Sequence, residues 1–263
     1  MKNPLRKRLL RELKNDIGKY LVIFLFMTAT IGFVSGFLVA DESMLYAYDE
    51  SFEKYNVENG NFTTEQKLTD NQRTRLEKEK VTIYENFYKD EDADTDLDSE
   101  PESTIRLFKN RTEVNLVCRM KGEMPQQKDE IAIDRMYAHN NDLQVGDVIS
   151  VDKKELTVTG LVALSDYSAL FSNSSDMMFD AVKFGVGIMT EEGYDAITDD
   201  HIKYCYSWKY DTEPKDENEE KEWSDNFVEV LAAHSSLTGY LPRYGNQAIK
   251  FTGDDMGGDK AMG

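Results

Sequence analysis

An uncharged run of 21 residues, from Tyr20 to Ala40, constrains this chain more than any other part of its sequence. At about 1.5 Å of rise per residue, a helix of this length measures roughly 30 Å, which matches the hydrocarbon core of a bilayer. A buried helix of a water-soluble protein would rarely be apolar on every face over such a length. The run therefore predicts a transmembrane helix over residues 20–40.

A cleaved signal peptide is the alternative to a retained membrane anchor. Such a peptide has an apolar core of about 7–15 residues, followed by a cleavage site of the small-x-small type. The apolar run here is longer, and a cleavage site ending at Ala40 would have Leu38 where the first small residue belongs. We expect the helix to be retained.

Charge is distributed very unevenly on the two sides of the run. The 263-residue chain carries a formal charge of −19, yet its first 19 residues carry +5, which leaves −24 for the part after the run. Because lysine and arginine beside a membrane segment favour the cytoplasmic side, residues 1–19 should be a basic cytoplasmic segment. The 223 residues after Ala40 should then lie outside the cytoplasm of a cell membrane. Their acidity disfavours binding to nucleic acid or to anionic lipid headgroups.

Small residues recur at every fourth position inside the run, at Thr28, Gly32, Gly36 and Ala40, and include a GxxxG motif. Such a ridge lets a second transmembrane helix approach closely. Glycine is also more frequent in membrane helices than in soluble ones, so ordinary usage would explain the same spacing. If the ridge packs, we expect its partner helices to belong to sequence that is not present here.

The helical period continues beyond the membrane segment. Met44, Tyr48, Phe52 and Tyr55 form one apolar stripe at helical spacing on an otherwise charged stretch. Residues 41–59 are therefore interpreted as a helical stalk that extends the membrane helix, or alternatively as a surface helix that packs on its own domain. Either helix should end at the Asn-Gly-Asn sequence of residues 59–61.

Residues 60–250 alternate between strand and helix patterns, which predicts a mixed α/β domain of short elements. Capping-box spacing begins at Thr63 and again at Thr69, so a helix should reach about Lys80. Residues 156, 158 and 162 should share the buried face of one strand. Strands are expected at residues 81–88, 104–109, 113–119, 130–134, 148–151, 156–162, 183–190 and 203–210, and helices at residues 135–140, 191–199 and around 223–231.

Aspartate and glutamate dominate residues 89–103, and four aspartates alternate from Asp92 to Asp98. The alternation raises the hypothesis of a calcium site, but an EF-hand loop needs glycine at its sixth position and glutamate at its twelfth. A loop starting at Asp92 has Leu97 and Ser103 at those positions, and a loop starting at Asp94 fails in the same way. We expect a mobile, solvated loop.

Several short motifs follow the membrane helix in a fixed order. They are NVENGNF at residues 56–62, GEMP at 122–125, EIAID at 130–134, VGDVI at 145–149, LTVTG at 156–160, NQAI at 246–249 and DDMGGDK at 254–260. In this order they resemble the MacB-like core domain, and the chain resembles the N-terminal part of an FtsX-like or MacB-like ABC transporter permease of a Gram-positive bacterium. The likeness spans nearly the whole chain.

This resemblance implies a first transmembrane helix, an extracytoplasmic MacB-like core domain over residues 60–250, and further membrane helices. It implies partnership with the lipid bilayer, with a separate cytoplasmic ABC ATPase subunit, and with a second permease copy or a paralogue. Export or mechanotransmission would follow from coupling of the ATPase to the outer domain. Residues 251–263 are interpreted as a linker toward a second transmembrane helix, and the chain as a fragment.

The sequence shows no motif of catalysis, cofactor binding or metal binding, and we expect the chain not to be an enzyme. Residues 253–260 space their glycines like a P-loop, but Asp259 stands where the lysine belongs. His139, His201 and His234 are isolated, with no second ligand at helical or hairpin spacing. Serines are plentiful but form no GxSxG elbow.

Two cysteines, Cys118 and Cys205, fall in expected strands on the outer side of the membrane, where a disulfide is chemically permitted. Two buried thiols are equally compatible with the sequence. The competing functional hypotheses are a single-pass sensor or binding ectodomain that recognises an extracellular peptide or protein, and an extracellular enzyme on a membrane anchor.

Overall fold

The computed structural model describes residues 16–198 and 202–258, so nearly all of the basic N-terminal segment lies outside the described residues. The chain divides into two compact units, Met1–Tyr48 and Asp49–Gly263. The predicted fold class, mixed α/β with an N-terminal apolar helix, is confirmed.

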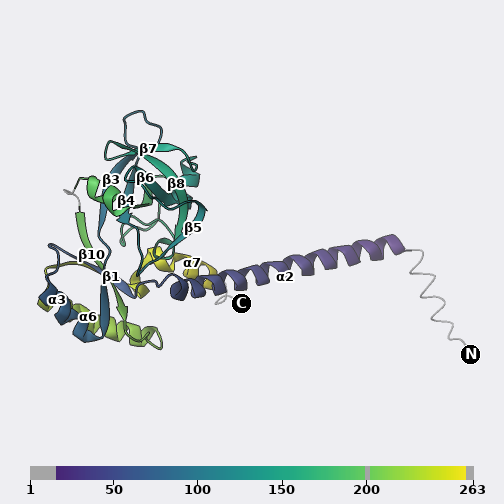
Figure 1. Cartoon of the computed structure of the whole chain (residues 1–263). Coiled ribbons are helices and arrows are strands. Elements are labelled where there is room, and N and C mark those ends of the chain that lie inside the picture. Colours follow the sequence, from purple (N-terminus) through teal and green to yellow (C-terminus); the bar gives the residue numbers. More distant parts are fainter. Residues whose placement is uncertain (1–15, 199–201, 259–263) are drawn as a thin grey trace, which may run out of the picture. The chain divides into compact units, whose positions relative to one another are not determined.

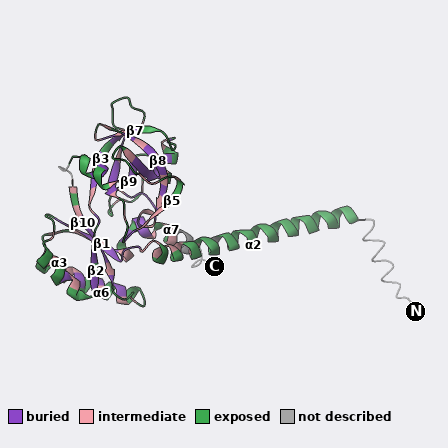
Figure 2. Cartoon of the chain, in the orientation of Figure 1, coloured by how far each residue is buried: buried purple, intermediate pink, exposed green. Residues whose placement is uncertain are grey.

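Helix α2 (Ile17–Lys54) runs without interruption through the apolar run and the expected stalk. In the apolar part, large side chains from Tyr20 to Val39 are 50–77% exposed, as the green ribbon in Figure 2 shows. No face of this part of α2 is buried among the described residues, whereas the core helix of a soluble domain buries at least one face. Among the described residues, α2 is the one helix that is long and apolar enough to cross a membrane.

The end of α2 differs from the expectation. The helix ends at Lys54, five residues before the Asn-Gly-Asn sequence, and Asn56 adopts a left-handed conformation with φ of 45°. Asparagine tolerates this conformation better than other non-glycine residues, which makes it a helix terminator. The amide of Val57 then donates to the Phe52 carbonyl at 2.9 Å. Gly60, the expected terminator, instead begins a strand.

A smaller lobe of the Asp49–Gly263 unit is an antiparallel sheet with two helices beside it. Its strands run in the order β11, β1, β10 and β2, and Figure 1 shows α3 and α6 together on this lobe. Phe62, Tyr206, Trp208, Phe227 and Leu231 form its buried core. The element bounds are β1 (Gly60–Thr64), α3 (Asp70–Leu76), β2 (Val81–Glu85), β10 (Ile202–Tyr210), α6 (Glu217–His234) and β11 (Leu237–Pro242).

A larger lobe of the same unit is built on strands whose pairings close into a ring. Strand β3 pairs with β4, β4 with β9, β9 with β6, β6 with β8, β8 with β7, and β7 again with β3. Closure removes the exposed strand edges and encloses an apolar core. The bounds are β3 (Tyr88–Asp94), β4 (Ser103–Lys109), β5 (Val117–Gly122), β6 (Glu130–Asp134), α4 (Arg135–Asn140), β7 (Val148–Val151), β8 (Lys154–Leu164), β9 (Phe184–Met189) and α5 (Glu191–Ala196).

Two segments join the lobes. Strand β10 pairs with β3 at its start and with β1 and β2 farther along, so it belongs to both lobes. The second is the C-terminal segment, in which the short helix η4 (Arg243–Gly245) follows β11 and leads into α7 (Gln247–Gly258). Next to η2 (Ser165–Tyr167), which follows β8, the Ser168 hydroxyl donates to the backbone carbonyls of Ala248 and Ile249 in α7, at 2.8 and 2.9 Å. The segment interpreted as a linker is thus helical as far as Gly258, and its role as a linker stays a prediction.

The sequence motifs occupy tight positions in the larger lobe. Gly122 of GEMP pairs with Gly160 of LTVTG between β5 and β8. A Cβ on Gly122 would lie 2.2 Å from the Thr159 carbonyl oxygen, and a Cβ on Gly160 would lie 2.4 Å from that of Glu123. Gly122 also has φ of 72°, which other residues rarely adopt. The spacing of these motifs therefore reflects a close backbone crossing that only glycine permits.

Most expected elements are confirmed, including the helix at residues 135–140, the strand at residues 148–151 and the Thr69 capping box. Besides the end of α2, four expectations were wrong. Thr63 caps no helix, because it lies in strand β1 and pairs with Cys205 of β10. The strand at residues 81–88 is broken at residues 86 and 87. The strand at 113–119 begins only at Val117. Residues 89–94 are a strand, not a solvated loop, because Ala93 packs in the core and Lys89 is fully buried.

Candidate functional site

The small-residue ridge of α2 stands open in the structure. Thr28, Gly32, Gly36 and Ala40 are all exposed, and a Cβ on either glycine would meet no described atom within 4 Å. The Thr28 hydroxyl donates to the Phe24 carbonyl of its own helix at 2.8 Å, so its polar group is satisfied without a partner helix. The ridge is sterically free to receive another helix, and packing on it stays a prediction.

The two cysteines are thiols in the structure. Cys205 is buried on β10, and burial, with the nearby charge of Glu58, raises the pKa of its thiol far above the usual range. Cys118 is half-buried on β5, with its thiol 3.8 Å from the Met120 sulfur. The bridge between them stays a prediction, which non-reducing mass mapping would test.

The acidic residues of the excluded calcium motif do gather in space. Carboxylate oxygens of Asp94, Asp96, Asp98 and Glu102 lie within 4.8 Å of one another. The Asp94 carboxylate already accepts the backbone amides of Leu97 and Ser99, and Asp96 accepts that of Asp98. These hydrogen bonds shape the turn between β3 and β4, which is a sufficient role for the cluster.

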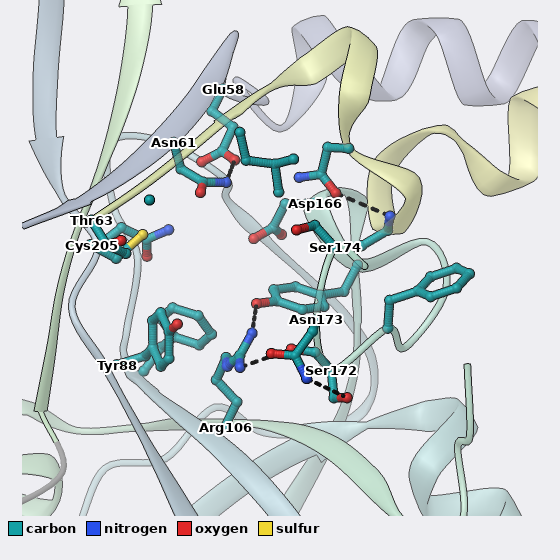
Figure 3. Close-up of a pocket in the computed structure, with 18 of the residues that line it drawn as sticks. Glu58, Asn61, Thr63, Tyr88, Arg106, Asp166, Ser172, Asn173, Ser174 and Cys205 are labelled. Carbon is teal, nitrogen blue, oxygen red and sulfur yellow. Dashed lines mark hydrogen bonds between the residues drawn. The ribbon is translucent and has the colours of Figure 1, made fainter. Parts of the chain in front are cut away.

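A cavity of about 210 Å³ lies where the two lobes meet, and Figure 3 shows its lining. The smaller lobe contributes residues of β1, β10 and β11, and the larger lobe contributes residues of β3 and β4. The loop from Asp166 to Ser174 and the start of α7 complete the wall. Three charged side chains that line it, those of Glu58, Arg106 and Asp166, are buried. We name this space the interlobe cavity.

Arg106 forms the base of the interlobe cavity. Its guanidinium donates to both oxygens of Asp90, at 2.7 and 2.8 Å, to the Tyr167 hydroxyl at 3.0 Å and to the Ser172 carbonyl at 3.1 Å. It also lies over the Tyr88 ring, 4.2 Å from the centroid. The bidentate ion pair with Asp90 neutralises the charge of Arg106 and fixes the plane of its guanidinium group.

Arg111 and Asp166 form a second ion pair, with only 5% of each side chain exposed. One guanidinium nitrogen, Nη1, donates to Asp166 Oδ2 at 2.7 Å, and the guanidinium lies 4.0 Å from the centroid of the Phe108 ring. In the described part of the chain, Asp166 Oδ1 and Arg111 Nε and Nη2 are buried without a hydrogen-bond partner. The pair is therefore charge-balanced but incompletely hydrogen-bonded, which is costly in a buried position.

Glu58 is held by neutral donors. Its carboxylate accepts hydrogen bonds from the Asn61 amide at 2.6 Å, from the Asn115 amide at 2.8 Å and from the Ser207 hydroxyl. The side-chain oxygen of Asn115, Oδ1, accepts a hydrogen bond from the Glu58 backbone amide in return, at 2.9 Å. Asn115 has a left-handed backbone conformation, with φ of 49°, which asparagine tolerates better than most residues. We call these four residues the Glu58 cluster.

No protein-family model matches the chain, and no curated protein matches it. Its structure is similar to the periplasmic region of MacB from Actinobacillus actinomycetemcomitans, at a TM-score of 0.41 and 12% identity, over 74% of this chain and 92% of that one. It is also similar to the extracellular domain of the noncanonic ABC-type transporter YknZ from Gram-positive bacteria, at a TM-score of 0.38 and 8% identity, over 68% of this chain and 98% of that one. The first is the kind of domain that the sequence motifs resemble.

Apart from the possible disulfide at Cys205, the sequence indicated no role for the residues that line the interlobe cavity. One signal was present, since the NVENGNF motif holds Glu58 and Asn61, and the NQAI motif holds Asn246 and Ala248. Both motifs line the cavity, although they lie almost 200 residues apart. Arg106, Arg111 and Asp166 belong to no motif, and only the fold brings them together.

The Asp166 carboxyl should make the stability of the folded protein depend on pH, with stability decreasing as the pH rises. Burial raises its pKa to about 6, with Arg111 opposing and Glu58 adding to the shift. Near pH 5 the carboxyl is therefore protonated in the folded chain and ionised in the unfolded chain. Its contribution to the stability of the folded state is present at low pH and is lost as the pH rises from about 4 to about 6. The stability of the unchanged protein relative to Asp166→Asn should fall by roughly 2 kcal/mol between pH 4 and pH 7.

Urea unfolding of the full chain in detergent would measure this difference. Tryptophan fluorescence reports on the Asp49–Gly263 unit alone, because both tryptophans, Trp208 and Trp223, belong to it. Glu100→Gln, on an exposed turn, serves as the matched charge change. Parallel pH profiles of the unchanged protein and Asp166→Asn would contradict the assignment.

Proposed function

We propose that the chain is a permease component of an ABC transporter. In this proposal α2 anchors it in the cell membrane, the N-terminus is cytoplasmic and the Asp49–Gly263 unit is extracytoplasmic. One observation supports the proposal most strongly: an exposed, uncharged helix separates a +5 segment from a −24 body. The positive segment favours the cytoplasmic side.

The motif series adds support for the type of outer domain. The four motifs of residues 122–160 cover the end of β5 and the loop after it, β6, the turn into β7, and part of β8, and Gly122 and Gly160 permit the close crossing of β5 and β8. We propose that residues 60–250 form the MacB-like core and that residues after 250 continue toward further membrane helices. A separate cytoplasmic ATPase subunit would supply ATP hydrolysis, and this chain would couple it to the outer domain for export or mechanotransmission.

The α2 ridge is the proposed contact with partner helices, either of a second permease copy or of a paralogue. Gly32→Leu combined with Gly36→Leu should lower recovery of the ATPase-containing complex at least about fivefold, because bulky side chains block the close approach that small residues allow. The measurement is quantitative mass spectrometry of complexes purified in mild detergent from membranes of the native cell.

Val34→Leu is the matched control, since Val34 is exposed and lies off the ridge. It should leave recovery unchanged. If a Walker-motif ATPase copurifies equally with all three proteins, the ridge is not the contact. If none copurifies with the unchanged protein, the ABC assignment fails.

One observation favours the second candidate, a single-pass binding ectodomain. The interlobe cavity is a polar, partly buried space of a size suited to a small ligand. The DNA that follows the codon for Gly263 separates the two candidates. Further apolar segments beside an ATPase gene support the permease, whereas their absence supports the ectodomain.

A further inference from the structure

The interlobe cavity has the properties of a built binding site. Its volume, about 210 Å³, exceeds the roughly 150 Å³ of an engineered cavity that binds benzene. Its walls come from two lobes and a loop, and they include Asn173 and Ser174, which are exposed to solvent. A small organic molecule could therefore enter from solvent and be surrounded by protein.

The charges in its wall do not balance. Arg106 is neutralised by Asp90 and Asp166 by Arg111, each in a direct ion pair. Glu58 is only 2% exposed, and in the described part of the chain its hydrogen bonds come from the neutral groups of Asn61, Asn115 and Ser207. One negative charge thus remains beside the cavity without a cation, and a buried charge is costly unless it is paired.

A second observation points to the kind of group that would complete the site. Asp166 Oδ1 is buried and has no hydrogen-bond partner among the described residues. Figure 3 shows the Asp166 carboxylate directed into the cavity, on the same side as Glu58. A carboxylate oxygen accepts hydrogen bonds, so the missing partner is a donor.

We propose that the interlobe cavity binds a small organic cation through a primary ammonium group, with Glu58 and Asp166 as its carboxylate partners. An ammonium group brings the missing charge and three N–H donors, of which one satisfies Asp166 Oδ1. Amide side chains of Asn61 and Asn86 can contact the rest of a polar ligand. An anion would face Glu58 and is excluded, and a neutral molecule would leave its charge unpaired. This inference is independent of the transporter assignment.

Four probes of similar size test the charge requirement on the full chain in detergent. Ligand-observed NMR would compare n-butylammonium with n-butanol and butyrate, and tetramethylammonium would test the need for N–H donors. Binding should be detected for n-butylammonium and should be at least tenfold weaker for the other three. All samples contain the same sodium chloride concentration, so that screening is constant.

A matched pair of variants locates the site. Glu58→Gln keeps the shape of the side chain but removes the surplus charge, and it should weaken n-butylammonium binding at least tenfold. Glu100→Gln removes an exposed charge far from the lining residues and should leave binding unchanged. If Glu58→Gln fails to fold, the probe series on the unchanged protein decides alone. Equal binding of the four probes, no binding of n-butylammonium, or unchanged binding in folded Glu58→Gln would each overturn the proposal.

Discussion

Replacing Arg111 by methionine is expected to lower the free energy of unfolding by about 3–5 kcal/mol. The substitution leaves Asp166 buried, 5% exposed, without the cation that lies 2.7 Å from its Oδ2. Methionine fills much of the volume of the arginine stem and can still contact the Phe108 ring. The loss therefore measures the uncompensated carboxylate rather than a cavity. Urea unfolding in detergent, followed by tryptophan fluorescence, gives the value.

The double variant Arg111→Met with Asp166→Leu is the control. Replacing a buried ion pair by apolar groups is often neutral or stabilising, so the double variant should recover most of the lost stability. Recovery should be strong here because the present pair leaves three buried polar atoms without a partner. A double variant that is as unstable as Arg111→Met would show that arginine acts through contacts other than Asp166.

Replacing Trp208 by alanine is expected to cost about 3–5 kcal/mol of unfolding free energy. Trp208 is fully buried at the centre of the smaller lobe. Its ring stacks on Tyr240 at a centroid distance of 5.1 Å and lies 5.3 Å from the ring of Phe227. Gly60 is packed so closely that a Cβ there would lie 2.2 Å from the indole, so the surrounding chain is shaped to this side chain.

Circular dichroism should follow unfolding of this variant, since the substitution removes one of the two tryptophans. Met177→Ala is the control, because Met177 is 96% exposed and its loss should change stability by less than about 0.5 kcal/mol. A cost below about 1 kcal/mol for Trp208→Ala would mean that the smaller lobe does not depend on this cluster.

Local patterns in the sequence predicted the elements that depend on local interactions. The Thr69 capping box, the helix at residues 135–140 and the hairpin into β8 are specified by side chains within a few residues of one another. Strand β1 was missed because Thr63 was interpreted as the cap of a helix, and both β1 and β11 gain their stability from pairing with distant segments. Residues 89–94 were misinterpreted because most of them are charged, so the sequence shows no alternation of apolar and polar residues. In the strand, the side chains of Lys89, Glu91 and Ala93 are nevertheless buried.

The membrane helix could be predicted because a bilayer demands a long uncharged run, which is visible without tertiary structure. The interlobe cavity could not. Its ion pairs join residues 16 and 55 positions apart, Asp90 with Arg106 and Arg111 with Asp166, and charged residues are common throughout the chain. Only the ring closure of the larger lobe and its junction with β1 place these side chains around one space.

Cysteine labelling in intact cells tests the central claim, a membrane anchor with an extracytoplasmic domain, most directly. In a Cys118→Ser background, the buried Cys205 should not react, and Glu100→Cys would offer an exposed thiol on the acidic unit. A membrane-impermeant maleimide should label Glu100→Cys without permeabilisation and should label Lys14→Cys only after it. Labelling of Glu100→Cys only after permeabilisation would contradict the account.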